Sequence, residues 1–219
     1  MPETQMLHTR WTTLWQRLCQ KHELPSDLHE RGFNALCRAY EGMGRYYHNL
    51  QHIEALLTLK DTYQNHLKNP EAVSLAIWYH DAVYSTLRKD SEKRSARWAR
   101  RDLRKWGLPE AVVNTVSVMI NTTAHHHQVP EPVDRDLLWF LDFDLNILSA
   151  HSDHYSLYVE QIRKEYRLIP EALYRQGRIK VLKTMLAADF IYHTPEFRQH
   201  KERAARENLR TEIAYWEHL

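Results

Sequence analysis

The sequence has little glycine, five residues among 219, and no stretch rich in glycine, proline or serine that reads as a linker. It has only two cysteines, Cys19 and Cys37, which fall in expected helices without the spacing of a disulfide framework. These shortages exclude a small disulfide-stapled secreted scaffold. They favour reduced thiols in a cytoplasmic protein and one continuous domain over residues 1–219.

Long hydrophobic runs and an excess of one charge are also missing. Residues 1–20 are amphipathic without a continuous apolar core, so they read as neither a signal peptide nor a membrane span. The net charge is +2 with neutral histidine, which gives no basic footprint for a nucleic-acid polymer. We therefore expect no membrane and no nucleic acid as partners, and the sequence leaves the oligomeric state open.

No convincing period-2 run is present, whereas apolar residues recur at helical spacing along the chain. The pattern predicts an all-α fold, a single helical bundle of eight to ten helices with short connections. Helices with both ends predicted cover about residues 4–20, 45–63, 70–81, 91–105, 108–120, 134–148, 153–168 and 178–192. Three more are predicted by their starts: a second helix with Ser26 as N-cap, a short piece from 170, and a last helix from 195.

Helix ends are signalled by capping residues. Asn69 is expected to be an N-cap with Pro70 at the first helical position, and Ser152 is expected to cap a later helix. Gly177 is expected to end the short piece that Pro170 starts.

Histidine is unusually frequent, with fifteen residues, and one pair stands at the end of the most apolar helix. The run Leu75–Tyr79 ends in His80-Asp81, where apolar flanks are expected to bury the backbone. A buried carboxylate without a partner is costly, and a divalent cation removes that cost. Imidazole nitrogen and carboxylate oxygen suit such a metal. A core histidine capped by its neighbour explains the dipeptide alone equally simply.

A second pair of histidines precedes this one. His48 and His52 are four residues apart, so on a helix they share one face. His80 follows His52 by 28 residues, enough for the helix to finish, turn and return antiparallel. The two segments can therefore present their side chains to one ion.

An acidic residue on a later helix would complete the cage. Asp142 and Asp144 lie in the strongly apolar stretch 137–148. Two residues apart on a helix, they point about 200° away from each other, so only one is expected to face the ion.

The order His52, His80-Asp81 and a late Asp resembles the HD superfamily of metal-dependent phosphohydrolases. The chain is more closely similar to a bacterial branch of it, with Ser91 where that branch is expected to have Asn. The matching blocks are Tyr-His-Asn-Leu-x-His-Ile (47–53), His-Asp-Ala-Val-Tyr (80–84), Ser-Glu-x-x-Ser-Ala (91–96), a Thr before a His (123–126), Leu-Asp-x-Asp-Leu (141–145), Arg-x-Glu-Tyr (163–166), Gly-Arg (177–178), Ile-Tyr (191–192) and Ala-Arg-x-Asn (205–208).

The stretch around His48 also resembles the site block of cyclic-nucleotide phosphodiesterases, which are HD relatives. That resemblance implies His52 as a metal ligand and His48 as the general acid that protonates the leaving oxygen. The last ligand of those enzymes follows a hydrophobic residue and precedes Leu. Phe143-Asp144-Leu145 has this pattern, so Asp144 is the first choice and Asp142 the second.

The resemblance implies hydrolysis of a small phosphoester by water that the metal activates. The substrate would be a phosphomonoester or a phosphodiester, a class that includes nucleotides. The metal would be Mn, Co, Ni, Mg, Fe or Zn, held by His52, His80, Asp81 and Asp144. Glu92 joins His48 as a candidate for proton transfer, although the helix dipole explains an acidic residue in a first turn as well.

Four further residues are candidates for binding the phosphate. Arg163 and Arg178, with Arg206 as a third arginine, have the bidentate geometry that phosphate recognition uses, and an ordinary ion pair is the alternative for each. His126, in the triple-histidine loop, would contact the substrate or a second metal, or would simply be solvated.

Two other functions stay open on the sequence. Some HD relatives hold two irons, which makes an iron-dependent oxygenase possible if further ligands such as His126 join the site. A non-catalytic module that keeps the cage to bind a metal or a nucleotide is the other alternative.

Overall fold

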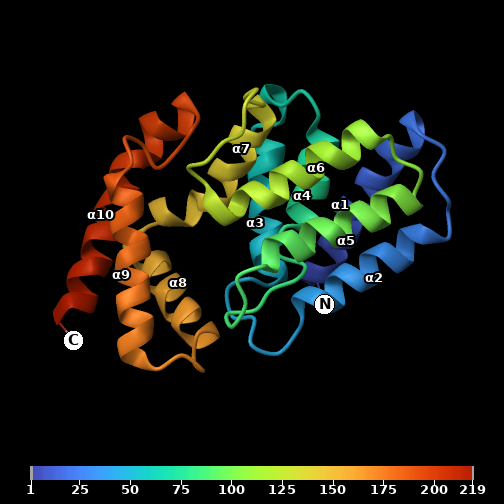
Figure 1. Cartoon of the computed structure of the whole chain (residues 1–219). Coiled ribbons are helices and arrows are strands. Elements are labelled where there is room, and N and C mark those ends of the chain that lie inside the picture. The colour runs from blue at the N-terminus through green and yellow to red at the C-terminus, as the bar shows by residue number, and fades with distance from the viewer. Residues whose placement is uncertain (1, 219) are drawn as a thin grey trace. The chain divides into compact units, whose positions relative to one another are not determined.

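The computed structural model describes the backbone of residues 2–218 and the side chains of residues 4–218 (Figure 1). Over that range the chain is all-α, with ten α-helices and no strand, which confirms the expected fold class and number of helices. The helices are α1 (Pro2–Lys21), α2 (Leu28–Tyr40), α3 (Leu50–Thr62), α4 (Pro70–Tyr79), α5 (Ser91–Lys105), α6 (Glu110–Thr122), α7 (Arg135–Asp144), α8 (Ser152–Glu165), α9 (Glu171–Ala187) and α10 (Pro195–His218). Three short 3-10 segments are η1 (Gln64–His66), η2 (Thr123–His125) and η3 (Leu145–Ser149).

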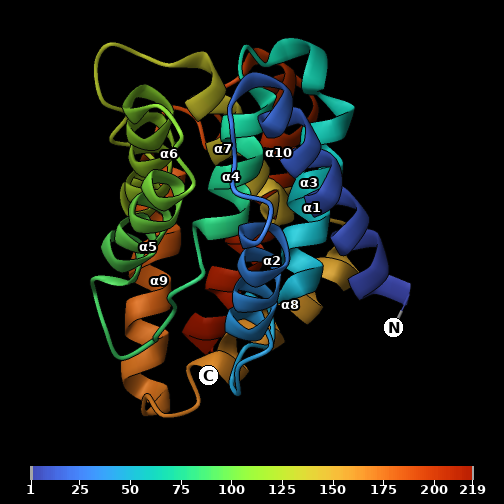
Figure 2. The same cartoon turned by 90° about the vertical axis from the view of Figure 1, so that its right-hand side faces the viewer.

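The helices gather into two compact units, Met1–Phe140 and Leu141–Leu219. In the first unit α4 is central, packed against α1 and α3 and against α5 and α6 (Figure 2). Every residue of α4 after Pro70 is buried, as expected for a helix that is apolar on all sides. None of the helices within residues 2–218 combines the length and apolar character that crossing a bilayer requires.

The start of α4 follows the predicted capping. The Asn69 carboxamide oxygen accepts a hydrogen bond from the Ala72 N–H at 3.1 Å, and Pro70 occupies the first helical position. The buried carboxylate of Asp136 on α7 accepts the N–H groups of Lys68 and Asn69 at 2.9 and 2.7 Å. These hydrogen bonds fix the start of α4, which helps to set the position of the last turn of this helix.

A cluster of tryptophans forms the core on the α1 side of α4. The Trp11 ring lies 5.4 Å from that of Trp78 and 5.8 Å from that of Trp106, both edge-to-face. Gly32 on α2 lets the rings approach, because a Cβ there would lie 3.1 Å from both Trp11 and Trp106. Since edge-to-face aromatic pairs each add about 0.5–1.5 kcal/mol beyond burial, this cluster makes α4 a rigid support.

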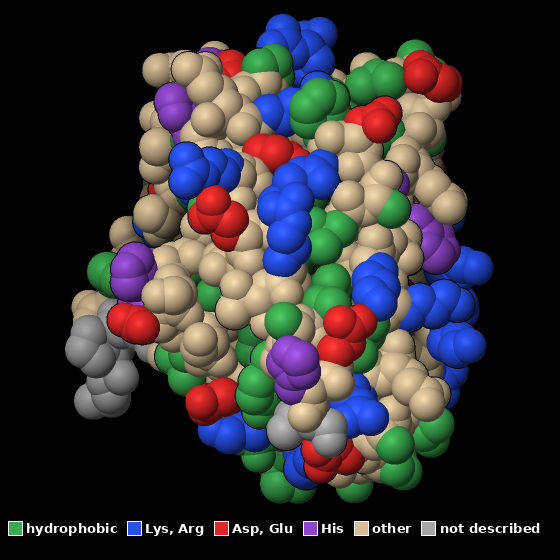
Figure 3. Space-filling view, turned by 90° about the vertical axis from the view of Figure 1, so that its left-hand side faces the viewer, with side chains coloured by type: hydrophobic (Ala, Val, Ile, Leu, Met, Phe, Trp, Pro, Cys, Tyr) green, Lys and Arg blue, Asp and Glu red, His purple; other side chains and the backbone are tan. Residues whose placement is uncertain are grey.

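The second unit is held by a buried polar network between α8, α9 and α10. Arg178 on α9 binds the Glu212 carboxylate of α10 in a bidentate fashion, at 2.7 and 3.0 Å. Glu212 also accepts from the Tyr155 hydroxyl at 2.5 Å and from the Trp216 indole at 3.0 Å. Burial raises the pKa of Glu212, but the hydrogen bonds and the charge of Arg178, together with the hydrogen bonds from Tyr155 and Trp216, outweigh it, so the pKa lies below its ordinary value. On the face shown in Figure 3, acidic and basic side chains are interspersed over most of the surface.

Three residues predicted to cap or end a helix do not do so. Ser26 is not an N-cap, because Pro25 opens a turn in which its carbonyl accepts the Leu28 N–H at 3.2 Å, and α2 begins only afterwards. Ser152 is the first residue of α8 and makes no cap, since His151 holds the N-cap position. Gly177 lies inside α9 instead of ending a helix, because an interior glycine costs only about 1 kcal/mol and buried Tyr174 and Leu182 anchor both sides.

Candidate metal centre

The first ligand segment is set by the start of α3. Asn49 is the N-cap, and its side-chain oxygen accepts the Gln51 N–H at 2.9 Å and the His52 N–H at 3.4 Å. This cap places His52 in the first turn, where its side chain is 5% exposed. The helix begins at Leu50, so the expectation that His48 and His52 share a helix face is wrong. His48 reaches the site from the segment before the helix.

The second ligand segment is the end of α4. His80 follows the last residue of the helix and is 1% exposed. Its Nδ1 lies 2.9 Å from the carbonyl oxygen of Ile77, which can only accept a hydrogen bond. Nδ1 therefore carries the proton in the neutral ring, and Nε2 keeps its lone pair. A hydrogen bond of this kind from the far nitrogen orients the histidine ligand in metal sites.

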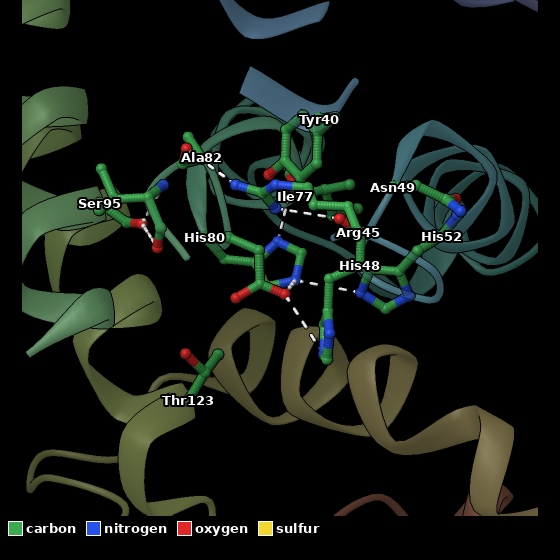
Figure 4. A network of polar contacts seen from close by, with 12 residues as sticks. Tyr40, Arg45, His48, Asn49, His52, Ile77, His80, Ala82, Ser95 and Thr123 are labelled. Atoms are coloured by element: carbon green, nitrogen blue, oxygen red, sulfur yellow. Dashed lines mark hydrogen bonds and ion pairs between the residues drawn. The ribbon is translucent and has the colours of Figure 1, made fainter. Parts of the chain in front are cut away.

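The two segments bring His52, His80 and Asp81 together (Figure 4). The Nε2 atoms of His52 and His80 face each other at 3.2 Å, and His80 Nε2 lies 3.2 Å from Oδ2 of Asp81. Two nitrogens bound to one cation at about 2.0–2.1 Å are about 2.8–3.0 Å apart at octahedral angles and about 3.3–3.4 Å apart at tetrahedral angles. The 3.2 Å spacing of the two imidazole nitrogens lies between these values and is compatible with a shared divalent cation.

The potential ligand atoms of these three residues all lie within 4.8 Å of one another. Among the described residues, no other group of three or more His, Cys, Asp or Glu side chains meets this criterion. Two imidazoles and a carboxylate, two of them buried, are the donor set of a borderline divalent metal. The residues present therefore fit the metal that the resemblance implies.

His48 stands beside this group. Its Nε2 lies 3.8 Å from Oδ2 of Asp81, and its side chain is 21% exposed. The ring packs at 4.4 Å from that of Tyr84 and at 5.0 Å from that of Tyr47. A partly exposed imidazole thus lies beside the carboxylate of Asp81.

Arg45 is a residue of the site that the sequence did not single out. Its Nη1 donates to the His48 carbonyl at 2.9 Å and its Nη2 to the Ala82 carbonyl at 3.1 Å (Figure 4). The guanidinium also lies over the rings of Tyr40 and Tyr84, at 5.0 and 5.4 Å. Arg45 thus joins the chain before α3 to the chain after α4. No sequence motif indicates this role, because both hydrogen-bond acceptors of Arg45 are backbone carbonyls and the carbonyl of Ala82 is 37 residues away.

Replacing Arg45 with methionine is expected to weaken the binding of Mn²⁺ by about 10–100-fold, the usual cost of removing a group that orients metal ligands. The two ligand segments lose the bridge between them, while the apolar stem still covers the tyrosine rings. Isothermal titration of the purified variant measures the affinity. Arg31→Met, an exposed arginine on α2, is the matched control. An affinity equal to that of the wild type would exclude a positioning role for Arg45.

The segment after Asp81 is tied to α5 by Ser95. Its hydroxyl accepts the Val83 N–H at 3.0 Å and donates to the Val83 carbonyl at 3.2 Å. Glu92 lies in the first turn of the same helix, half-buried, and is not part of the cluster of His52, His80 and Asp81. Buried Ser91, which stands where Asn was expected, has a hydroxyl without a hydrogen-bond partner in the described part of the chain. His126 follows η2 and also lies outside the cluster.

The two late aspartates belong to the second unit and have different surroundings. Asp142 is fully buried, and its carboxylate accepts the N–H groups of His193 and Thr194, both at 2.7 Å, and the Thr194 hydroxyl at 2.6 Å. Burial raises its pKa to about 6 although these hydrogen bonds act the other way. Asp142 thus serves the start of α10. Asp144 is the last residue of α7.

The arginines proposed as phosphate ligands also lie in the second unit. Arg178 is engaged in the buried pair with Glu212, and Arg206 binds Glu202 and the carbonyls of Leu186 and Ala188. Both guanidinium groups therefore hold the fold together. Arg163 donates to the Tyr166 carbonyl at 2.9 Å, lies over the Tyr174 ring at 4.8 Å and lines a cavity in this unit.

The chain matches no protein-family model, no curated protein and no solved structure.

Proposed function

We propose that the chain is a metal-dependent phosphohydrolase of the HD type that acts on a small phosphoester. The observation that carries the proposal is the meeting of His52, His80 and Asp81 at one point, with the two Nε2 atoms 3.2 Å apart. A shared cation would offset the cost of burying a carboxylate beside the two imidazoles. The sequence blocks that resemble the HD superfamily supply the reaction class.

Asp144 is our proposal for the fourth ligand. Asp142 is the weaker choice, because both of its carboxylate oxygens already accept hydrogen bonds from the start of α10. The support for Asp144 is the resemblance alone, because Phe143-Asp144-Leu145 has the pattern of the last ligand in cyclic-nucleotide phosphodiesterases.

A divalent cation at this centre would lower the pKa of water and polarise a phosphoryl oxygen. His52, His80 and Asp81 would hold and orient it, and Ile77 would keep the His80 lone pair pointed at it through Nδ1. His48 would give a proton to the leaving oxygen and recover one from water, with the Asp81 carboxylate nearby to stabilise its charged form. Glu92, Arg163 and His126 stay predictions for proton transfer and phosphate binding.

A panel of phosphomonoesters, phosphodiesters and nucleotides, assayed with added Mn²⁺, Co²⁺, Ni²⁺ or Mg²⁺, tests the reaction class. We expect metal-dependent release of phosphate or of a monoester. His48→Gln is expected to lower kcat by about 10²–10⁴-fold while Mn²⁺ affinity changes little, because the residue moves protons and is not a ligand. Oxygen consumption with iron would favour the oxygenase alternative instead. Tight nucleotide binding with no turnover under any metal would favour the binding module.

A further inference from the structure

The ring of Tyr84 packs against the imidazole of His48. The two ring centroids are 4.4 Å apart and the planes are inclined by 32°, so the rings are closer to parallel than to perpendicular. Aromatic rings in close contact attract each other beyond the effect of burial. Tyr84 is the third residue after the candidate ligand Asp81, and its side chain is partly exposed. A residue that follows the second ligand segment thus reaches one that precedes the first.

His48 depends on neighbouring side chains for its orientation, because it precedes α3 and is not held by a regular element. Its Nε2 lies 3.8 Å from Oδ2 of Asp81, beyond hydrogen-bond distance, so this contact restricts the ring only weakly. A group that moves protons must be held to within about 0.5 Å by residues whose own positions are fixed by packing. The ring of Tyr84 is placed to do this for the imidazole.

The backbone beside Tyr84 is fixed by α5. The Ser95 hydroxyl accepts the Val83 N–H at 3.0 Å and donates to the Val83 carbonyl at 3.2 Å (Figure 4). Both polar groups of the residue before Tyr84 are therefore bound to one side chain. The phenol ring starts from a backbone that is held in place, which a support for another side chain requires.

Arg45 closes the arrangement. It donates to the carbonyls of His48 and Ala82, at 2.9 and 3.1 Å, and its guanidinium carbon lies 5.4 Å from the centre of the Tyr84 ring. A guanidinium within about 6 Å of an aromatic ring is attracted to it. Arg45 thus holds the backbone of His48 and the ring of Tyr84, and that ring contacts the imidazole. Backbone and side chain of His48 are fixed by the same group of residues.

We propose that Tyr84 is a positioning residue, whose ring holds the His48 imidazole in the orientation from which it gives a proton to the leaving oxygen. The inference rests on the proposed function, in which His48 moves protons and is not a metal ligand. Tyr84 itself supplies neither a proton nor a metal ligand. It acts through its ring, so phenylalanine can take its place.

Esters with different leaving groups test the proposal, assayed on the full chain at saturating Mn²⁺. The probes are the phenyl and p-nitrophenyl esters of phosphate, as monoesters and as diesters. Tyr84→Leu is expected to lower kcat for the phenyl esters by about 10–100-fold, since a misplacement of about 1 Å costs up to about 10²-fold. For the p-nitrophenyl esters the loss is expected to be much smaller, because nitrophenolate leaves without a proton. KM and Mn²⁺ affinity are expected to stay close to those of the wild type.

Further variants separate positioning from a general structural effect. Tyr84→Phe keeps the ring and is expected to retain the wild-type kcat, and Tyr215→Leu, which changes an exposed tyrosine on α10, is the matched control. In a His48→Gln background, Tyr84→Leu is expected to lower kcat little further, because residues that act through one another are not additive. The NMR signals of the His48 ring, identified by their absence in His48→Gln, are expected to shift in Tyr84→Leu and not in Tyr84→Phe. Tyr84→Met removes the ring in the same way and serves if the leucine variant does not fold.

Wild-type kcat for the phenyl esters in a folded variant without the ring would overturn the inference and leave the proposed function standing. An equal loss for both kinds of ester, or the same loss in the His48→Gln background, would also overturn it, because Tyr84 would then act on something other than His48. No hydrolysis of any ester by the wild type, with any of the metals, would contradict the proposed function itself and the inference with it.

Discussion

Replacing His80 with alanine is expected to lower the affinity for Mn²⁺ by more than about 100-fold and to abolish metal-dependent phosphoester hydrolysis. Removal of groups that merely orient a ligand costs 10–100-fold in metal affinity, so the loss of a ligand itself costs more. His80 is the member of the cluster that contacts both others, at 3.2 Å each. Without it, His52 and Asp81 alone make a weak, open site.

Two comparisons make this result specific. Asp81→Asn keeps the volume and removes the charge, so it is expected to lose metal affinity to a similar degree. His151→Ala changes an exposed histidine before α8 and is expected to bind Mn²⁺ as the wild type does. Isothermal titration gives the affinities, and thermal unfolding checks that the variants are folded. Wild-type Mn²⁺ affinity in a folded His80→Ala variant would show that the cluster is not the metal site.

Replacing Arg178 with alanine is expected to destabilise the protein by about 3–5 kcal/mol, the usual effect of leaving a buried charge without its partner. The Arg178 side chain is 12% exposed and that of Glu212 is 2% exposed. The variant leaves the Glu212 carboxylate with only the Tyr155 hydroxyl and the Trp216 N–H. Chemical denaturation followed by circular dichroism measures the loss.

An exposed pair between the same two helices provides the control. Lys183 and Glu217 lie 2.7 Å apart with side chains 59% and 47% exposed. Lys183→Ala is expected to cost less than about 1 kcal/mol, because solvent screens the pair. If Arg178→Ala kept wild-type stability and instead raised KM for the phosphoester, Arg178 would be a phosphate ligand after all.

Local signals in the sequence predicted most of the fold. Helical periodicity with no period-2 run gave the all-α class, and Asn69-Pro70 marked the start of α4 because a cap and an N1 proline act within one turn. Gly177 gave a wrong prediction of a helix end. An interior glycine destabilises a helix by less free energy than the burial of Tyr174 and Leu182 on either side of it contributes. Local chemistry predicts an end, but tertiary packing decides whether the helix stops.

The candidate centre was predictable in part, because some of its signals are also local in the sequence. The apolar run before His80-Asp81 indicated burial, and the spacing from His52 indicated a return of the chain, so these three could be grouped. Arg45 was missed because its partners are carbonyls, which every residue has. The pairing of Arg178 with Glu212 was not predicted, because the two residues are 34 positions apart and sequence alone does not reveal that contact.

The most direct test of the central claim is anomalous X-ray diffraction from crystals of the full chain soaked in Mn²⁺. We predict a peak about 2.0–2.3 Å from the Nε2 atoms of His52 and His80 and from an oxygen of Asp81. A peak only at another location, such as the histidines 125–127, or no peak in crystals that hold Mn²⁺ in solution, would contradict the account.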